Sequence, residues 1–124
     1  MRRPAPAHRR VRGDAARKAG RTAEVLAALW LMLHGWRILG FRLKTPAAEI
    51  DILARRGDVL AVVEVKARPT MELALAAVSP LQAERLSRAG ADFAARRRDL
   101  SSLAVRLDMV ALAPGKLPRH ISNL

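Results

Sequence analysis

The segment over residues 59–66 constrains the fold most, because an almost unbroken apolar run ends in two charged residues. A run of this length is typical of a central strand that is covered on both faces of a sheet. Side chains two residues apart on a strand point to the same face, so Glu64 and Lys66 are expected to lie together. Charged side chains are seldom placed on a buried strand without a partner. The end of this strand is therefore a candidate functional site.

Further elements are predicted on both sides of this strand. They are a helix over residues 14–34, strands over 36–43 and 49–54, a helix over 80–97 and a strand over 105–112. The order α-β-β-β-α-β predicts an α/β fold with a mixed sheet flanked by helices. In the first helix, an apolar stripe at three- and four-residue spacing predicts the buried face, and its members are Ala16, Ala19, Ala23, Leu26 and Leu33.

Local signals mark the ends of these elements. Asp14 is a candidate N-cap for the first helix. The turn at residues 55–58 contains Gly57, which can take the positive φ that a tight hairpin needs. Ser79 as N-cap, Pro80 at the first helical position and Gln82 at the third predict a helix start closed by a capping box.

The net charge of +12 is the main compositional clue to a partner. A cation this strong associates with phosphate polymers, although a large charge also serves solubility. The chain has two Trp, two Phe and no Tyr, so stacking of single-stranded bases is a poor fit. Arginine suits recognition of the backbone of duplex or branched DNA better.

The absence of cysteine excludes disulfides, thiolate nucleophiles and cysteine-bound zinc, and is typical of a cytoplasmic protein. The longest apolar run, over residues 25–33, is about half of what a bilayer requires, so no membrane association is expected. The chain has no phosphate-binding glycine loop, no serine-hydrolase elbow and no paired-histidine metal motif. Carboxylates and lysine are left as candidates for chemistry.

Asp51 is the acid expected to join Glu64 and Lys66. It lies on the neighbouring strand of the predicted hairpin, and counting back from the turn places it across from Glu64. Two acids and a lysine on adjacent strands can form a divalent-metal site. Alternatively, Glu64 and Lys66 pair at a strand end in solvent, and Asp51 forms an exposed cross-strand pair with Lys66.

Glu24 is the acid within the apolar part of the first helix. It is either a fourth member of the site or a solvent-facing residue that pairs with Lys18 or Arg21.

These residues resemble the YraN-like family of small bacterial proteins, which are predicted endonucleases of the PD-(D/E)XK superfamily, distantly similar to Holliday junction resolvases. The matching segments are residues 20–24, 48–54, 63–68 and 106–110. The sequence departs from the family pattern at Ala48, where Gly is usual, and at Gln82, where Lys is common.

The resemblance implies a restriction-endonuclease-like core. Asp51 and Glu64 would bind Mg²⁺ or Mn²⁺, Lys66 would be the catalytic lysine and Glu24 the helix-borne acid. It further implies that Arg68 contacts phosphate. The other residues expected to bind nucleic acid are Arg21, Arg42 and Lys44.

In domain terms, we expect a disordered basic arm over residues 1–13, an endonuclease-like domain over 14–113 and a tail over 114–124. The function expected is Mg²⁺-dependent hydrolysis of DNA phosphodiesters, including branched or damaged DNA. A homodimer is compatible with this, because resolvase-like enzymes use two sites. The alternative is a non-catalytic module that binds DNA or RNA and retains a vestigial site, since a charge of +12 explains binding without catalysis.

Overall fold

The computed structural model describes the backbone from residue 7 to residue 124 and the side chains from residue 16 onward. The helices are α1 (Ala7–Leu33), α2 (Met71–Leu75) and α3 (Pro80–Ala95). The strands are β1 (Arg37–Lys44), β2 (Glu49–Arg56), β3 (Val59–Ala67), β4 (Ala104–Leu112) and β5 (Arg119–Ile121).

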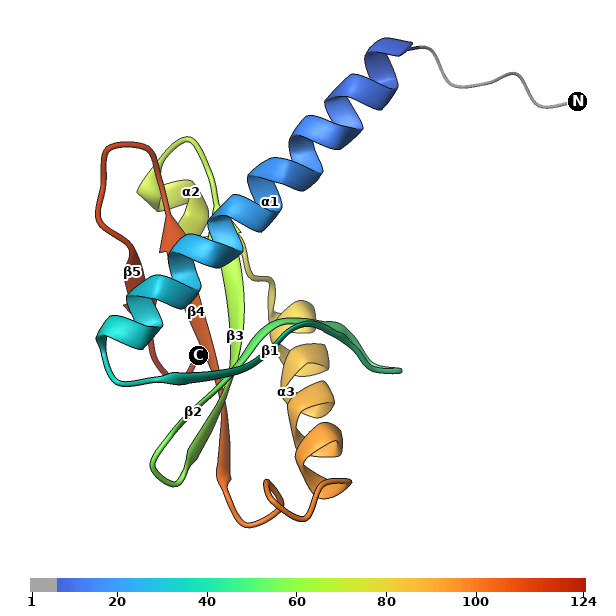
Figure 1. Cartoon of the computed structure of the whole chain (residues 1–124), viewed down its shortest axis with the longest axis vertical. Helices are drawn as coiled ribbons and strands as arrows, with labels where there is room; N and C mark the ends of the chain where they lie inside the picture. Colours follow the sequence, from blue (N-terminus) through green and yellow to red (C-terminus); the bar gives the residue numbers. More distant parts are fainter. Residues whose placement is uncertain (1–6) are drawn as a thin grey trace, which may run out of the picture.

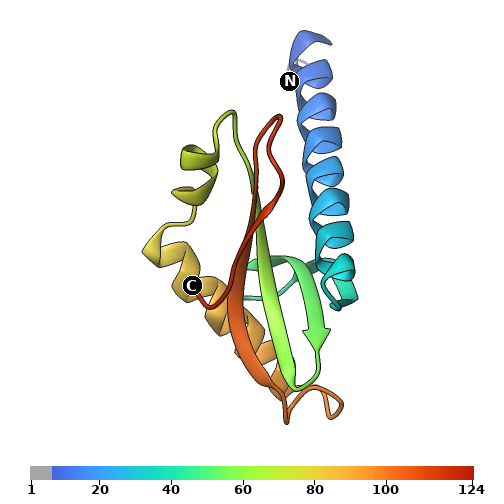
Figure 2. The same cartoon turned by 90° about the vertical axis from the view of Figure 1, so that its left-hand side faces the viewer.

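The strands form one mixed sheet in the order β1-β2-β3-β4-β5. β3 and β4 run parallel, and the other neighbouring strands run antiparallel. The sheet lies between α1 on one face and α2 and α3 on the other, as the two perpendicular views show (Figure 1 and Figure 2). The expected α/β class is confirmed, and the architecture is that of a restriction-endonuclease-like core.

The hairpin of β2 and β3 fixes the register at the centre of the sheet. Its paired residues run from Arg56 and Val59 at the turn to Ile52 and Val63 at the far end. Gly57 lies in the turn with a φ of 58°, as predicted. The ladder ends at Ile52 and Val63, so Asp51 and Glu64 are the next residues beyond it.

β3 is covered on both faces, as its apolar run predicts. On one face, Val63 packs with Ala27 and Leu31 of α1. On the other face, Leu60 and Val62 pack with apolar residues of α3. Because side chains alternate along the strand, Glu64 and Lys66 lie on the α3 face.

Two predictions about α1 were wrong. The helix begins at Ala7, so Asp14 is not its N-cap, and residues 7–13 of the expected arm are helical. Residues 1–6 of that arm lie outside the described residues. Of the predicted stripe, Ala23 is buried and the other members, Ala16, Ala19, Leu26 and Leu33, are exposed. The helix buries Ala27, Ala28 and Leu31 together with Ala23. Over the described residues, no helix is long and apolar enough to cross a membrane.

The end of the chain is more ordered than its sequence predicts. β5 pairs with β4 through Met109 and Ile121 and through their neighbours. The fully buried Asp108 holds this end, because its carboxylate accepts two hydrogen bonds from Arg106, at 2.9 and 3.0 Å, and one from the Asn123 backbone N–H at 3.0 Å. His120 Nε2 lies 2.7 Å from the same carboxylate.

Gly90 sets the distance between α3 and the sheet. A Cβ atom there would collide with Val62 and would lie 3.2 Å from Val105 Cγ1. We expect Gly90→Ala to lower the free energy of unfolding by about 1–3 kcal/mol, because the overpacking outweighs the better helix propensity of alanine. Urea denaturation measures the change.

Gly20→Ala is the matched control for that substitution. Gly20 also lies in a helix, but nothing lies within 4 Å of an added Cβ. Alanine there should stabilise the protein by up to about 1 kcal/mol. Equal effects at the two positions would contradict the close approach of α3 to β3.

Candidate active site

The ends of β2 and β3 bring two carboxyl groups together. Asp51 and Glu64 follow the last paired residues of the hairpin, and their carboxyl groups are close enough for the charge of Asp51 to raise the pKa of Glu64. Asp51 Oδ2 also accepts the backbone N–H of Val65 at 2.9 Å. A side chain therefore continues the hydrogen bonding of the two strands where the backbone pairing stops.

Glu64 is buried, with 5% of its surface exposed, and its partners come from two elements. Lys66 Nζ lies 3.2 Å from Glu64 Oε1. Gln82 Nε2, in the first turn of α3, donates to the same oxygen at 3.4 Å. The Glu64–Lys66 pair is largely shielded from water, so the alternative of a solvent-exposed pair at a strand end is wrong.

The start of α3 follows the prediction only in part. Ser79 Oγ accepts the backbone N–H of Gln82 at 3.1 Å, as an N-cap should. The expected capping box would turn the Gln82 side chain back toward Ser79. The hydrogen bond that it forms in the structure is with Glu64, so this residue links α3 to the carboxylates.

Burial and the nearby charge of Asp51, against the opposing effect of Lys66, together raise the pKa of Glu64 to about 7. Two neighbouring carboxylates repel each other when both are ionised, so ionisation of Glu64 is disfavoured without a cation. Near neutral pH, Glu64 is therefore only partly ionised, and a bound cation would displace its proton.

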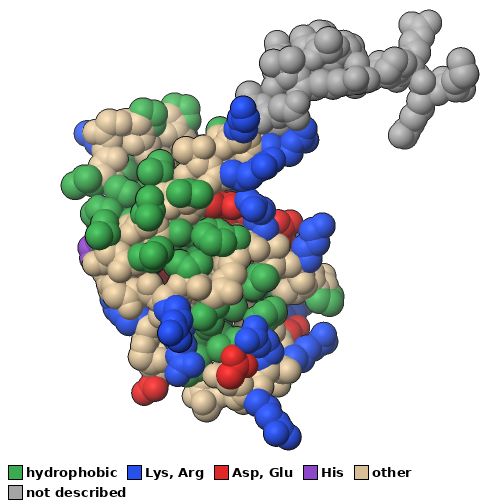
Figure 3. All heavy atoms as spheres, in the orientation of Figure 1, with side chains coloured by type: hydrophobic (Ala, Val, Ile, Leu, Met, Phe, Trp, Pro, Cys, Tyr) green, Lys and Arg blue, Asp and Glu red, His purple; other side chains and the backbone are tan. Residues whose placement is uncertain are grey.

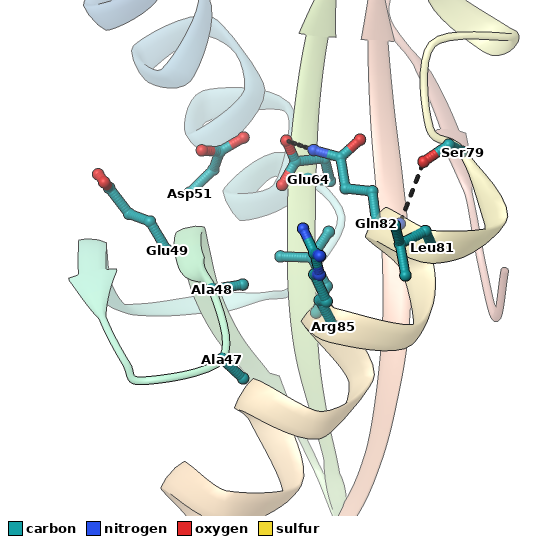
Figure 4. A pocket seen from close by; sticks show the side chains of 10 residues that line it. Ala47, Ala48, Glu49, Asp51, Glu64, Ser79, Leu81, Gln82 and Arg85 are labelled. Carbon is teal, nitrogen blue, oxygen red and sulfur yellow. Dashed lines mark hydrogen bonds between the residues drawn. The ribbon is translucent and has the colours of Figure 1, made fainter.

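These groups line a pocket of about 630 Å³ between the sheet and α3 (Figure 4). Asp51 and Glu64 form one side of it, and Gln82 and Arg85 face them from α3. In the space-filling view, acidic side chains gather in a recess next to α1, with Lys and Arg side chains around it (Figure 3).

Glu24 reaches the edge of the site from α1. Burial raises its pKa, and the nearby charges of Asp51 and Glu49 raise it further. It pairs with Arg42 at 2.7 Å, rather than with Lys18 or Arg21 as the simpler interpretation expected. Arg42 has a φ of 49°, in the left-handed region that residues other than glycine seldom adopt. Glu24 therefore lies near Asp51, but its carboxylate forms a salt bridge with Arg42.

The other residues expected to bind nucleic acid do not gather at one place. Arg21 is exposed on α1, one turn before Glu24, and Lys44 is exposed at the end of β1. Arg68 follows β3 and lines an apolar groove with Trp30 of α1. Arg68 lies away from the pocket that holds Asp51.

The donor set at the pocket suits a hard divalent cation. Among the described residues, no group of three or more His, Asp or Glu side chains is placed to hold a metal ion. The site therefore offers the Asp51 and Glu64 carboxylates. Mg²⁺ commonly takes one or two protein carboxylates and completes its shell with water and substrate phosphate. The residues present fit Mg²⁺ or Mn²⁺ bound in this way.

Three residues of the pocket were not identified as site residues from the sequence. The sequence pattern assigns Gln82 to a helix cap and gives Glu49 and Arg85 no role, yet all three line the pocket. Arg85 follows Gln82 by three residues, which places the two on neighbouring positions of one helix face. That spacing is the signal that could have found Arg85.

Known proteins resemble this chain over most of its length. The model of the uncharacterised protein family UPF0102 matches residues 23–112. A UPF0102 protein of Caulobacter vibrioides is 65% identical over 115 residues, covering 93% of this chain and 92% of the relative. A UPF0102 protein of Paramagnetospirillum magneticum is 50% identical over 114 residues, covering 89% of this chain and 88% of the relative. The names of these relatives state no activity.

Proposed function

The chain belongs to the uncharacterised UPF0102 family, and from the geometry of its acidic pocket we propose that it is a metal-dependent nuclease that hydrolyses DNA phosphodiester bonds. One observation carries the proposal. Asp51 lies near the buried Glu64, which pairs with Lys66, and the pKa of Glu64 is raised to about 7. Such perturbed groups in a pocket are typical of functional sites.

Each residue has a distinct task in this proposal. Asp51 and Glu64 hold Mg²⁺ or Mn²⁺, and Gln82 orients Glu64 through its hydrogen bond. The bound ion supplies Lewis-acid stabilisation of phosphoryl oxygen and a water of lowered pKa. Lys66 Nζ, which lies 3.2 Å from Glu64 Oε1, can also donate to a phosphate oxygen as negative charge develops there.

The charge of the whole chain favours nucleic acid as the substrate. With a net charge of +12, the protein attracts phosphate polymers, and the acidic pocket is a local exception within a basic molecule. Duplex or branched DNA is the substrate that we propose. Val25, Leu29 and Met32, which α1 leaves exposed, offer a surface on which a homodimer can form.

A non-catalytic module that binds DNA or RNA is the second candidate. The net charge favours it, because it accounts for binding without chemistry. The small number of metal ligands among the described residues favours it as well, since two carboxylates bind a cation less tightly than a larger set.

Lys66→Ala separates the two candidates. Wild-type protein should cleave at least one of a panel of linear, flapped and four-way DNAs when Mg²⁺ or Mn²⁺ is present. Lys66→Ala should lower the cleavage rate by about 100-fold, because it removes one donor aimed at the developing charge. Gel assays under single-turnover conditions measure the rates.

Lys116→Ala is the charge-matched control, since Lys116 is exposed in the turn before β5. Its cleavage rate should stay close to that of the wild type. If wild-type protein binds DNA yet shows no metal-dependent cleavage and no Mg²⁺ or Mn²⁺ binding by calorimetry, the nuclease proposal is wrong and the binding module stands.

A further inference from the structure

A second pocket lies further along α3 from the acidic pocket. The connection between β1 and β2, residues 45–48, lies against this helix, and a pocket opens on each side of it. The first is the acidic pocket, where Ala47 and Ala48 face α3 (Figure 4). The second, of about 260 Å³, lies between Lys44 to Pro46 and the far end of α3. The two pockets follow each other along α3, and we refer to this row of two pockets as the groove along α3.

Basic side chains stand at both ends of this groove. Arg85 lines the acidic pocket, and Arg96 lines the second pocket together with Lys44 and Arg97. Arg85 and Arg96 are eleven residues apart, which is about three helical turns, so they lie on one side of α3 about 16 Å apart along its axis. Asp92 lies on the same side, between them.

The two arginines at the ends of the groove differ from their neighbours in their contacts. Within the described part of the chain, neither Arg85 nor Arg96 forms a salt bridge. By contrast, Arg88 pairs with Glu84 at 3.1 Å, and Arg97 pairs with Asp99 at 2.9 Å. An exposed guanidinium without an internal partner is well suited to a phosphate, which it can bind through two N–H groups.

We propose that one DNA strand, with its scissile phosphate in the acidic pocket, runs along α3 and places further backbone phosphates on Arg85, Arg96 and Lys44. This rests on the proposed function, because it names how the substrate of the same site is held. The separation of about 16 Å between the two arginines corresponds to about five nucleotides of B-form rise. The contacts are to phosphate, so they position the strand without reading its sequence.

Asp92 allows a test in which the expected change in DNA affinity has the opposite sign to that at the arginines. A phosphate backbone in the groove passes an acid that repels it, so Asp92→Asn should tighten binding by about twofold. Arg85→Ala and Arg96→Ala should each weaken binding by about threefold and reduce the slope of log K against log salt by about one. Fluorescence anisotropy with a labelled duplex in metal-free buffer measures all three, with no need for cleavage.

Arg119→Ala is the charge-matched control. Arg119 is exposed on β5, at the edge of the sheet opposite β1. Its removal changes the net charge by the same amount, but beyond about one Debye length of 8 Å its effect on the groove is screened at physiological salt. Its affinity and salt slope should match those of the wild type.

The outcomes separate this inference from the nuclease proposal. If Arg85→Ala and Arg96→Ala bind as Arg119→Ala does, or if Asp92→Asn binds no more tightly than wild type, the groove is not the path of the strand. That result leaves metal-dependent cleavage by the wild type standing. If the arginine variants weaken binding as expected but the wild type never cleaves DNA, the groove is supported as the binding path and the nuclease proposal is rejected.

Discussion

Glu64→Gln should abolish metal-dependent cleavage and at the same time stabilise the protein at pH 8. The substitution removes a charged metal ligand with little change in volume. Changes to groups that merely support a ligand cost about 10- to 100-fold, so loss of the ligand itself should lower the cleavage rate by more than about 1,000-fold. Binding of DNA without metal should be retained, because one negative charge facing phosphate has gone.

The gain in stability follows from the pKa of Glu64. Burial, together with the charge of Asp51, raises this pKa from 4.5 to about 7 in the folded protein. The contribution of the group to stability is therefore fully present below about pH 4.5 and is lost as pH rises through 7. With about 1.36 kcal/mol for each pKa unit, the loss at pH 8 is about 3 kcal/mol.

Urea denaturation at pH 5 and pH 8 measures this effect. The glutamine side chain that replaces Glu64 cannot ionise. The wild type should therefore lose stability between pH 5 and pH 8, whereas the variant should not. Glu84→Gln is the control, because Glu84 is exposed on α3 and should leave the pH dependence as it is in the wild type. If Glu64→Gln and the wild type are equally stable at pH 8, Glu64 ionises in the folded protein at no cost in stability. That result would contradict the raised pKa of Glu64.

Asp108→Ala should cost about 3–5 kcal/mol of stability, the largest effect that we expect from a single substitution away from the pocket. The change leaves the Arg106 guanidinium and the Asn123 N–H without their acceptor, and His120 without its partner. For a chain of this size the melting temperature should fall by more than about 10 °C, taking about 4 °C per kcal/mol. Circular dichroism during heating measures the fall.

Asp99→Ala is the matched control for Asp108→Ala. Asp99 also accepts two hydrogen bonds from one arginine, Arg97, at 3.2 and 2.9 Å, but it is exposed. Its loss should leave the melting temperature close to that of the wild type, because exposed pairs contribute little. An Asp108→Ala protein that melts like Asp99→Ala would show that the buried cluster does not hold the end of the chain.

The pH dependence of Asp108 has the opposite sign to that of Glu64. Burial alone would raise the pKa of Asp108, but the hydrogen bonds from His120, Arg106 and Asn123 outweigh burial and lower it. Its stabilising contribution is therefore present above its unfolded pKa of about 3.9 and is lost as pH falls through its lower folded pKa.

Strand alternation and the position of the turn predicted how the central residues of the site are arranged. The alternation of β3 placed Glu64 and Lys66 on one face, and the turn at Gly57 set the register that brings Asp51 across from Glu64. These inferences succeed because a shift of one residue would turn Glu64 and Lys66 toward the apolar face that packs against α1. Both properties are local and can be read from adjacent residues.

The parts that the sequence did not predict depend on contacts between distant residues. Gln82 can serve its own helix cap or reach a neighbouring strand, and the choice depends on how near α3 lies to β3. That distance is set by Gly90 against Val62, about two turns further along the helix. β5 is a short strand with no strand pattern, and the buried Asp108 holds the residues around it. The first turns of α1 carry no apolar period and depend on helix propensity.

The hydrogen bond between Asp51 and Val65 bears on how this carboxylate would bind a metal ion. Asp51 Oδ2 already accepts the Val65 N–H at 2.9 Å, so Oδ1 is the oxygen that is more available to a cation, and a cation in the pocket would favour Asp51 as a monodentate ligand. Monodentate binding suits the small octahedral shell of Mg²⁺ better than the wide shell of Ca²⁺, which readily takes a bidentate carboxylate. A backbone N–H of β3 would thereby influence which ion the carboxylate of β2 prefers.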